Sequence, residues 1–296
     1  MKRALLILLA ATACAGAQSR GATHMIQFAE LAAMPAPAAD ERASYGENAL
    51  QFGELRLPPG FASAKAHTVP VVVLIHGGCW RAAYDLKHNA PLAAAIAKEG
   101  FAVWTIEYRR LGDEGGGWPG TFADAAAGVD YVRTLAASHA SLDTSRVVIA
   151  GHSAGGQLAL WIASRRAGEA GSPAASVSPL AVKGVVSLAG ITDMAAYGAA
   201  PGGCNSSVTP LMGGTSAQVA ARYAAVSPSE RGKLAVTVHL VHGSADPIVP
   251  IAQSEEYAAR NGAVLHRVEG VGHFDVVAPV GEAFVAVMAS IRAILH

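Results

Sequence analysis

The chain has 296 residues, of which 52% are hydrophobic, and its 22 basic and 22 acidic side chains give a formal net charge of zero. This length can bury a large core, and α/β sheets of this size are often a single domain. The sequence has neither a basic run that would recruit nucleic acid nor an acidic tail, so nucleic acid is not an expected partner.

The amino-terminal residues predict export from the cytoplasm. Lys2 and Arg3 precede an apolar run over residues 4–13, which is too short to cross a bilayer as a stable anchor. Small residues at positions 15–17 match a signal-peptidase site, so residues 1–17 are predicted to be a signal peptide. We therefore expect an exported protein, periplasmic or secreted, without a membrane-spanning helix.

The cysteines are interpreted in the light of this export. The segment ending at Cys14 resembles a weak lipoprotein box, in which Cys14 would carry a lipid anchor, but the box lacks the usual Leu and plain cleavage is favoured. Cys79 and Cys204 then remain, both in predicted loops. In an oxidising compartment they are candidates for one disulfide. Because the sequence gives no distance between them, the pairing stays open.

The remaining chain has one main pattern. Residues 18–48 are rich in Ala and Pro and are interpreted as a leader to a domain over residues 49–296. An edge strand is expected at 49–57, and buried strands at 69–75, 101–106, 146–150, 182–188, 235–241 and 264–268. Helices are expected at 86–99, 121–137, 154–165, 251–261 and 282–295. This alternation predicts an α/β fold, a mostly parallel sheet with helices on both faces.

One segment breaks this alternation. Between residues 193 and 228 the sequence is irregular, rich in Gly, Pro, Ser and Asn, with a short helical patch. Because it lies between two predicted strands, it is interpreted as a short cap-like insertion that could cover the carboxyl edge of the sheet.

A nucleophile motif lies where a predicted buried strand meets a predicted helix. In Gly151-His152-Ser153-Ala154-Gly155 the small residues permit the sharp turn that lifts the serine hydroxyl above the sheet. The helix that begins there directs its amino-terminal dipole and the Ala154 N–H toward a developing oxyanion. The motif alone is common by chance, but the strand–turn–helix context favours a nucleophile over an idle serine.

A second oxyanion donor is expected from His76-Gly77-Gly78-Cys79-Trp80, which follows the first long buried strand. The two glycines let the backbone N–H of Gly77 or Gly78 approach a reacting carbonyl. His76 is expected to orient this loop, and Trp80 to pack beneath it. Both are also candidates for substrate contacts.

The general base and its acid follow the last two predicted strands. His273 follows the strand at 264–268, and Asp246 follows the strand at 235–241, which gives the chain order Ser, Asp, His of this fold. Asp193 is the alternative acid, although a loop-fixing role or a substrate contact suits it better. Asp275 comes too soon after His273 to orient it. Three other histidines could rival His273 as the base and are expected instead to pack or hydrogen-bond locally: His152, His239 and His242. Of these, His152 is also a candidate substrate contact.

With these residues in place, the chain from about residue 49 onward resembles the α/β-hydrolase superfamily of serine esterases. Residues 76–80 are similar to the His-Gly-Gly-x-Trp motif of kynurenine formamidases and related bacterial esterases. Tyr108-Arg109, Trp118-Pro119 and Asp124 resemble a pattern of hormone-sensitive-lipase-like carboxylesterases. The resemblance implies hydrolysis of carboxylic esters or small amides by a Ser-His-Asp triad, without metal or cofactor.

The favoured hypothesis is an exported carboxylesterase that acts on small or medium acyl esters, with plant-wall acetyl and feruloyl esters among the candidates. Its rivals are an arylformamidase or amidase acting on N-formylkynurenine-like substrates and a prolyl-oligopeptidase-like peptidase. The peptidase is expected less, because the sequence has no recognisable propeller or large gating domain. A non-catalytic binding module is expected least, since every triad residue type is present. Whether the protein is a monomer or a dimer stays open.

Overall fold

The computed structural model describes residues 24–176 and 178–296. The predicted signal peptide over residues 1–17 and the lipidation of Cys14 therefore lie outside the described residues. Within the described ranges, each helix is too short or too polar to cross a membrane.

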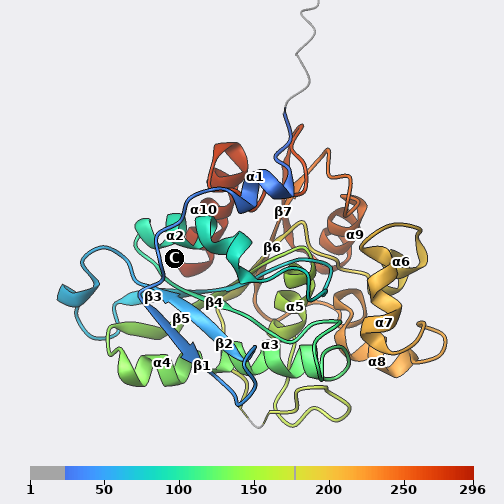
Figure 1. Ribbon diagram of the computed structural model, residues 1–296, viewed down its shortest axis with the longest axis horizontal. Coiled ribbons are helices and arrows are strands. Elements are labelled where there is room, and N and C mark those ends of the chain that lie inside the picture. Colours follow the sequence, from blue (N-terminus) through green and yellow to red (C-terminus); the bar gives the residue numbers. More distant parts are fainter. Residues whose placement is uncertain (1–23, 177) are drawn as a thin grey trace, which may run out of the picture.

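One sheet organises the described part of the chain, and its eight strands have the order β1-β2-β4-β3-β5-β6-β7-β8 (Figure 1). The pairs β1–β2 and β2–β4 are antiparallel, and all other neighbouring pairs are parallel. The predicted mostly parallel α/β sheet is therefore confirmed. The strands are β1 (Glu41–Ser44), β2 (Phe52–Arg56), β3 (Val69–Ile75), β4 (Ala102–Ile106), β5 (Leu142–His152), β6 (Gly184–Leu188), β7 (Thr237–Gly243) and β8 (Val264–Val268).

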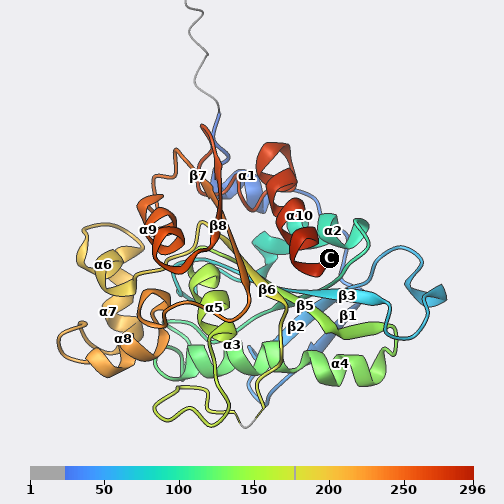
Figure 2. The ribbon, with the colours of Figure 1, turned by 180° about the vertical axis from the view of Figure 1, so that it is seen from behind.

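Helices cover both faces of this sheet. Figures 1 and 2 place α1, α2 and α10 on one side and α3 and α4 on the other. The helices are α1 (Phe28–Ala32), α2 (Ala90–Lys98), α3 (Gly120–Asp130), α4 (Val132–Ser138), α5 (Ala154–Ala163), α6 (Met194–Ala199), α7 (Val208–Met212), α8 (Ala220–Val226), α9 (Ala252–Asn261) and α10 (Gly281–Leu295). Single 3₁₀ turns are η1 (Phe61–Ser63), η2 (Leu86–Asn89), η3 (Asn205–Ser207) and η4 (Pro228–Glu230).

The core has two layers because the central strands are buried on both faces. In β3, Val71, Val73 and Ile75 pack with the cluster that includes α3, α4 and α5, while Val72 and Leu74 pack with the cluster that includes α2 and α10. Such strands are apolar at every position. This explains why the sequence of β3 is a continuous run of hydrophobic residues.

The leader interpretation of residues 18–48 is corrected by the structure, since part of this segment belongs to the fold. Strand β1 pairs in full register with β2, and Leu31 of α1 is completely buried against the helices α2 and α10. Both elements are too short to show periodicity, and β1 is an edge strand with alternate residues exposed. The folded domain therefore begins well before residue 49.

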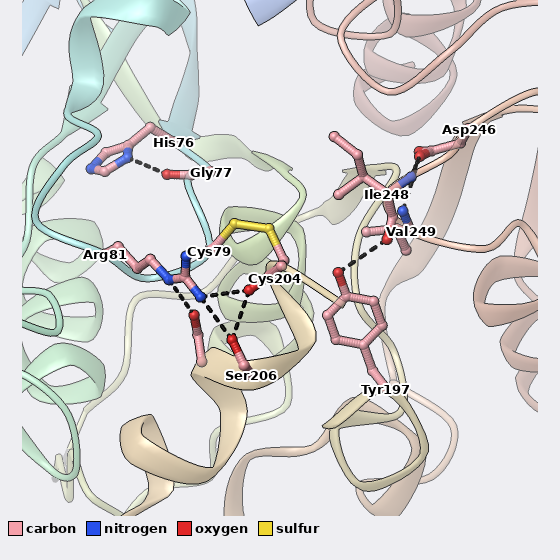
Figure 3. Close-up of a disulfide and its surroundings, with 12 residues drawn as sticks. His76, Gly77, Cys79, Arg81, Tyr197, Cys204, Ser206, Asp246, Ile248 and Val249 are labelled. Carbon is pink, nitrogen blue, oxygen red and sulfur yellow. Dashed lines mark hydrogen bonds between the residues drawn. A yellow bond between two sulfur atoms is a disulfide. The ribbon is translucent and has the colours of Figure 1, made fainter. Parts of the chain in front are cut away.

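Residues 193–228, predicted as a cap-like insert, contain α6, η3, α7, α8 and η4. These short helices lie together at one side of the molecule (Figure 1). A disulfide between Cys79 and Cys204 joins the insert to the loop after β3, with the two Cα atoms 5.1 Å apart (Figure 3). The guanidinium of Arg81 adds hydrogen bonds to the hydroxyls of Ser206 (2.9 Å) and Ser207 (2.6 Å). The insert is thus fixed to the loop at the carboxyl end of β3.

A partly buried ion pair fixes the loop after β4. The Arg109 side chain donates two hydrogen bonds to Asp124 of α3, from Nε to Oδ2 (2.6 Å) and from a terminal nitrogen to Oδ1 (2.7 Å). The Gln51 side chain donates a third, to Oδ1 of Asp124 (2.6 Å). This accounts physically for the Tyr-Arg…Asp pattern in the sequence, because the pair holds residues 107–110 against α3.

Replacing Cys79 and Cys204 with serine is expected to lower the free energy of unfolding by about 2–5 kcal/mol, because the disulfide closes a long loop. The two cysteines are 125 residues apart in the sequence. Denaturant unfolding of the wild type and the double variant measures the difference. A reductant should destabilise the wild type and leave the variant unchanged. Equal unfolding free energies for the oxidised wild type and the variant would contradict this role.

Candidate active site

Ser153 occupies a strained turn between β5 and α5. Its φ and ψ angles are 54° and −118°, outside the regions that ordinary residues adopt. The turn is this tight because its flanking glycines have no room for a side chain: a Cβ at Gly151 would lie 2.1 Å from the Gly155 carbonyl oxygen. A Cβ at Gly155 would lie 2.2 Å from the carbonyl oxygen of Ile75 in β3. The sequence motif is therefore a steric requirement of this turn.

His273 and Asp246 form a buried hydrogen-bonded pair at the same edge of the sheet. The His273 Nδ1–H donates to Asp246 Oδ2 over 2.6 Å, and both side chains are almost fully inaccessible. Asp246 Oδ1 accepts the backbone N–H groups of Ile248 (2.8 Å) and Val249 (2.9 Å). Because Asp246 occupies the Nδ1 side of the ring, Nε2 is the nitrogen left to exchange a proton in the pocket.

The carboxylate of Asp246 is held in its ionised form. Burial alone would raise its pKa, but hydrogen bonds from His242, His273 and the Val249 backbone hold the pKa well below its usual range. His242 Nε2 lies 3.3 Å from Asp246 Oδ2, and its Nδ1 lies 2.7 Å from the Ser254 hydroxyl oxygen. His242 is thus a local hydrogen-bonding residue, as expected, and its Nε2 lies between the Val249 carbonyl oxygen (3.0 Å) and the candidate acid.

The loop after β3 approaches the serine closely. A Cβ on Gly77 would lie 3.0 Å from the Cβ of Ser153, so only glycine lets this backbone come so near. Gly78, Cys79 and Trp80 then have φ angles of 103°, 56° and 54°, which turn the chain away sharply. On the other side, Ala154 is the first residue of α5, so its N–H has no partner within the helix. Backbone donors from both sides therefore flank Ser153.

A cavity of about 90 Å³ lies next to these groups, and Ser153 and His273 both line it. The disulfide-bonded Cys79 and Cys204 also line it, and its wall includes four large aromatic or apolar side chains: Phe28, Tyr84, Ile248 and Phe274. Two buried histidines, His88 and His152, complete one side. Burial lowers the pKa of His88 to about 3 and that of His152 well below its ordinary value, so both are neutral at physiological pH. The cavity is small, and the two histidines that line it beside His273 carry no charge.

The other predicted site residues have these positions. His152 lines the cavity, and its Nε2–H donates to the His273 carbonyl oxygen over 3.0 Å. His76 is completely buried in the loop and bonds the Gly77 carbonyl and Glu107, which is the orienting position expected for it. Trp80 is also fully buried, and its indole N–H donates to the Gln157 side chain over 3.3 Å. Trp80 does not line the cavity and lies beneath the loop, which is the packing position expected for it.

Asp193 does not belong to the cavity that contains Ser153. Its carboxylate accepts the Ala196 N–H over 2.9 Å and caps α6, while its own N–H donates to the Gln253 side chain over 2.7 Å. The loop-fixing role is the one that the structure supports. No substrate contact is assigned to Asp193, because its carboxylate caps α6 and does not line the cavity. Asp275 likewise accepts the Gly272 N–H over 2.9 Å and serves its own loop.

Several cavity residues were missed by the sequence reasoning. Phe28 comes from the segment interpreted as a leader, and its ring contacts Tyr84, His88 and Phe274 at centroid distances of 5.1, 5.7 and 5.7 Å. No periodicity in the sequence marks it. Tyr84 lies between the His-Gly-Gly motif and the next predicted helix, and His88 lies within the helix expected at 86–99, where no motif marks it. Among the described residues, no cluster of three His, Cys, Asp or Glu side chains is arranged to hold a metal ion.

The sheet order, the turn at Ser153 and the placement of His273 and Asp246 after adjacent strands define an α/β hydrolase. The family model named BD-FAE matches residues 61–260, more than half of the chain. The chain therefore belongs to the BD-FAE family of esterase-like α/β hydrolases. No curated protein sequence matches it significantly.

Solved structures with the same fold include several esterases. A truncated carbohydrate esterase from gut microbiota superposes with a TM-score of 0.69 at 22% identity, covering 87% of this chain and 97% of that one. Inhibited esterase B from Lactobacillus rhamnosis gives 0.70 at 21% identity, covering 90% of each chain. Thermogutta terrifontis esterase 2 phosphonylated by sarin gives 0.65 at 18% identity, covering 88% of this chain and 94% of that one.

Proposed function

We propose that this protein is a serine carboxylesterase that hydrolyses esters of small or medium acyl groups, with Ser153 as nucleophile, His273 as general base and Asp246 as the orienting acid. The observation that carries the proposal is the short bond between His273 Nδ1 and Asp246, in a cavity that His273 shares with the strained Ser153. Membership of the BD-FAE family and the esterases among the solved structures of the same fold support the ester as the bond that is cleaved.

The proposed reaction has two acyl-transfer steps. His273 Nε2 takes the Ser153 proton as the serine oxygen attacks the ester carbonyl, and Asp246 stabilises the imidazolium that forms. The backbone N–H groups of Ala154 and of Gly77 or Gly78 stabilise the oxyanion of the tetrahedral intermediate. His273 then protonates the departing alcohol, leaving an acyl-enzyme. Water, deprotonated by His273, attacks the acyl carbon, and His273 returns the proton to the Ser153 oxygen as the acid is released.

The cavity favours short acyl groups. Its volume of about 90 Å³ is far below that of pockets for drug-sized ligands. Phe28, Phe274 and Ile248 provide apolar contacts for a short acyl or alkoxy group, and the neutral His88 and His152 add no charge that would attract a charged substrate. An acetyl or similarly small acyl group fits this environment.

The proposed place of action is outside the cytoplasm. The disulfide between Cys79 and Cys204 supports this proposal, because such bonds persist in oxidising compartments and are rare in the cytosol.

The substrate class is tested with a panel of p-nitrophenyl esters from acetyl to octanoyl, together with N-formylkynurenine. The acetyl and butyryl esters should be hydrolysed best. The kcat/KM for the octanoyl ester should be lower by roughly tenfold or more, because extra methylenes overfill the cavity. Ser153→Ala should reduce kcat by at least about 10⁴-fold. A higher kcat/KM for the formamide than for every ester would replace the proposal with an arylformamidase.

The assignment of the acid is tested by comparing Asp246→Asn with Asp193→Asn. Asp246→Asn should lower kcat by roughly 10⁴-fold, because the amide favours the wrong tautomer of His273. Asp193→Asn should leave kcat unchanged, since Asp193 only caps α6. Thermal unfolding of both variants controls for loss of structure. Loss of turnover in Asp193→Asn alone, with Asp246→Asn active, would show that the acid has been misassigned.

A further inference from the structure

The loop at residues 76–78 carries the candidate oxyanion donors and is called the oxyanion loop here. It is held by hydrogen bonds that involve three side chains that the proposed mechanism does not use. His76 Nδ1–H donates to the Gly77 carbonyl oxygen over 2.8 Å, a contact drawn in Figure 3. The Tyr108 hydroxyl donates to the His76 carbonyl oxygen over 2.9 Å. Tyr108 also stacks on the His76 ring, with centroids 4.4 Å apart and planes 15° apart. Glu107 bonds the other side of that ring.

The two carbonyls belong to the peptides that carry the candidate oxyanion donors. The His76 carbonyl shares its peptide group with the Gly77 N–H, and the Gly77 carbonyl shares its peptide group with the Gly78 N–H. A carbonyl that accepts a hydrogen bond polarises its peptide, which makes the N–H of the same peptide a stronger donor. Both candidate donors are therefore strengthened from the side opposite the substrate.

The bonding pattern assigns a positive charge to His76. A backbone carbonyl can only accept, so Nδ1 must carry a proton. Nε2 lies 2.7 Å from Glu107 Oε1, which also accepts the Tyr108 N–H (3.0 Å) and lies 3.2 Å from the Arg110 guanidinium. Glu107 Oε2 accepts the Leu86 N–H over 3.1 Å. Even without His76, three donors surround this carboxyl group and keep it ionised, so it can only accept from Nε2, which is therefore protonated as well.

The surroundings preserve this state. His76 and Glu107 are 0% and 1% exposed, and charge-assisted hydrogen bonds are roughly twice as strong as neutral ones. Burial raises the pKa of Glu107, but the charges of His76 and Arg110 and its hydrogen bonds outweigh this and lower it. The neighbouring His88, 5.8 Å from the His76 ring, is neutral because burial lowers its pKa to about 3.

We infer that Glu107, His76 and Tyr108 form a relay that positions and polarises the Gly77 and Gly78 N–H groups for the oxyanion. Glu107 keeps His76 doubly protonated, His76 acts on the Gly78 donor, and Tyr108 acts on the Gly77 donor. None of the three touches the substrate, so they are positioning residues. The inference rests on the proposed esterase function and explains why Glu107 and Tyr108 directly follow β4, the strand that pairs with β3.

The catalytic part of this inference is tested with Glu107→Gln and Tyr108→Phe, assayed with p-nitrophenyl acetate. The relay acts on charge that develops in the transition state, so kcat should fall about tenfold in Glu107→Gln and about threefold in Tyr108→Phe, with KM nearly unchanged. The matched control is Tyr257→Phe, which removes a buried hydroxyl without a hydrogen-bond partner among the described residues and should keep wild-type kcat. Wild-type kcat in both relay variants would overturn the relay, as would a rise in KM alone.

The charge on His76 is tested independently by ¹⁵N NMR of histidine-labelled wild-type protein, with the signal assigned through its loss in His76→Asn. Both ring nitrogens of His76 should be protonated at neutral pH. A single protonated ring nitrogen would overturn the relay, and this holds even where Glu107→Gln fails to fold. Failure of the proposed function is distinguishable, because the wild type would then hydrolyse no ester while the NMR result for His76 still stands.

Discussion

The candidate site depends on the close approach of the turn at Ser153 to the end of β3. The backbone at Gly155 lies so near the Ile75 carbonyl that a methyl group could not be inserted. Gly77 of the following loop also lies close to Ser153, since a Cβ there would be 3.0 Å from the Ser153 Cβ. A non-glycine residue at φ 54° and ψ −118° costs of the order of 1–3 kcal/mol. Hydrogen bonds from the Ser153 N–H to the Leu188 carbonyl and from the Gly156 N–H to the Ser153 carbonyl help to hold the turn. The strained turn is therefore what places the Ser153 side chain at the cavity.

Charge around this turn is confined to a few buried groups with defined partners. Asp246 is ionised because three donors and the ring of His273 surround it, and it carries that charge at one side of the cavity. On the other side, Glu107 and Arg110 enclose His76 beneath the oxyanion loop. Between them, His88 and His152 are neutral. The region where an acyl group would lie is thus flanked by fixed charges but lined by uncharged walls.

Much of the fold and the proposed triad could be predicted from the sequence, because both depend on local pattern. The strand β3 was predicted with its exact bounds, since a strand buried on both faces is apolar throughout. Ser153, Asp246 and His273 can be proposed from the sequence because each follows a strand, and parallel strands end at one edge of the sheet. The long helix expected at 121–137 is instead divided between α3 and α4 at Tyr131, since local periodicity does not reveal such a break.

What the sequence could not reveal are contacts between residues far apart in the chain. Phe28 reaches the cavity from a short helix whose composition resembles a linker, and Cys79 meets Cys204 only because the insert folds back over the loop after β3. Likewise, nothing in the local pattern predicts that Glu107 bonds His76, which lies 31 residues earlier. These contacts shape the cavity and the oxyanion loop, so they affect specificity more than reaction class.

The central claim is that Ser153 is an activated nucleophile, and reaction with a fluorophosphonate probe tests it most directly. Such a probe forms a covalent bond to an activated serine, and one esterase of the same fold has been phosphonylated by sarin. Folded protein should take up one label, mapped by mass spectrometry to Ser153, and both unfolded protein and Ser153→Ala should take up none. Folded wild-type protein that is not labelled at Ser153 would contradict the account.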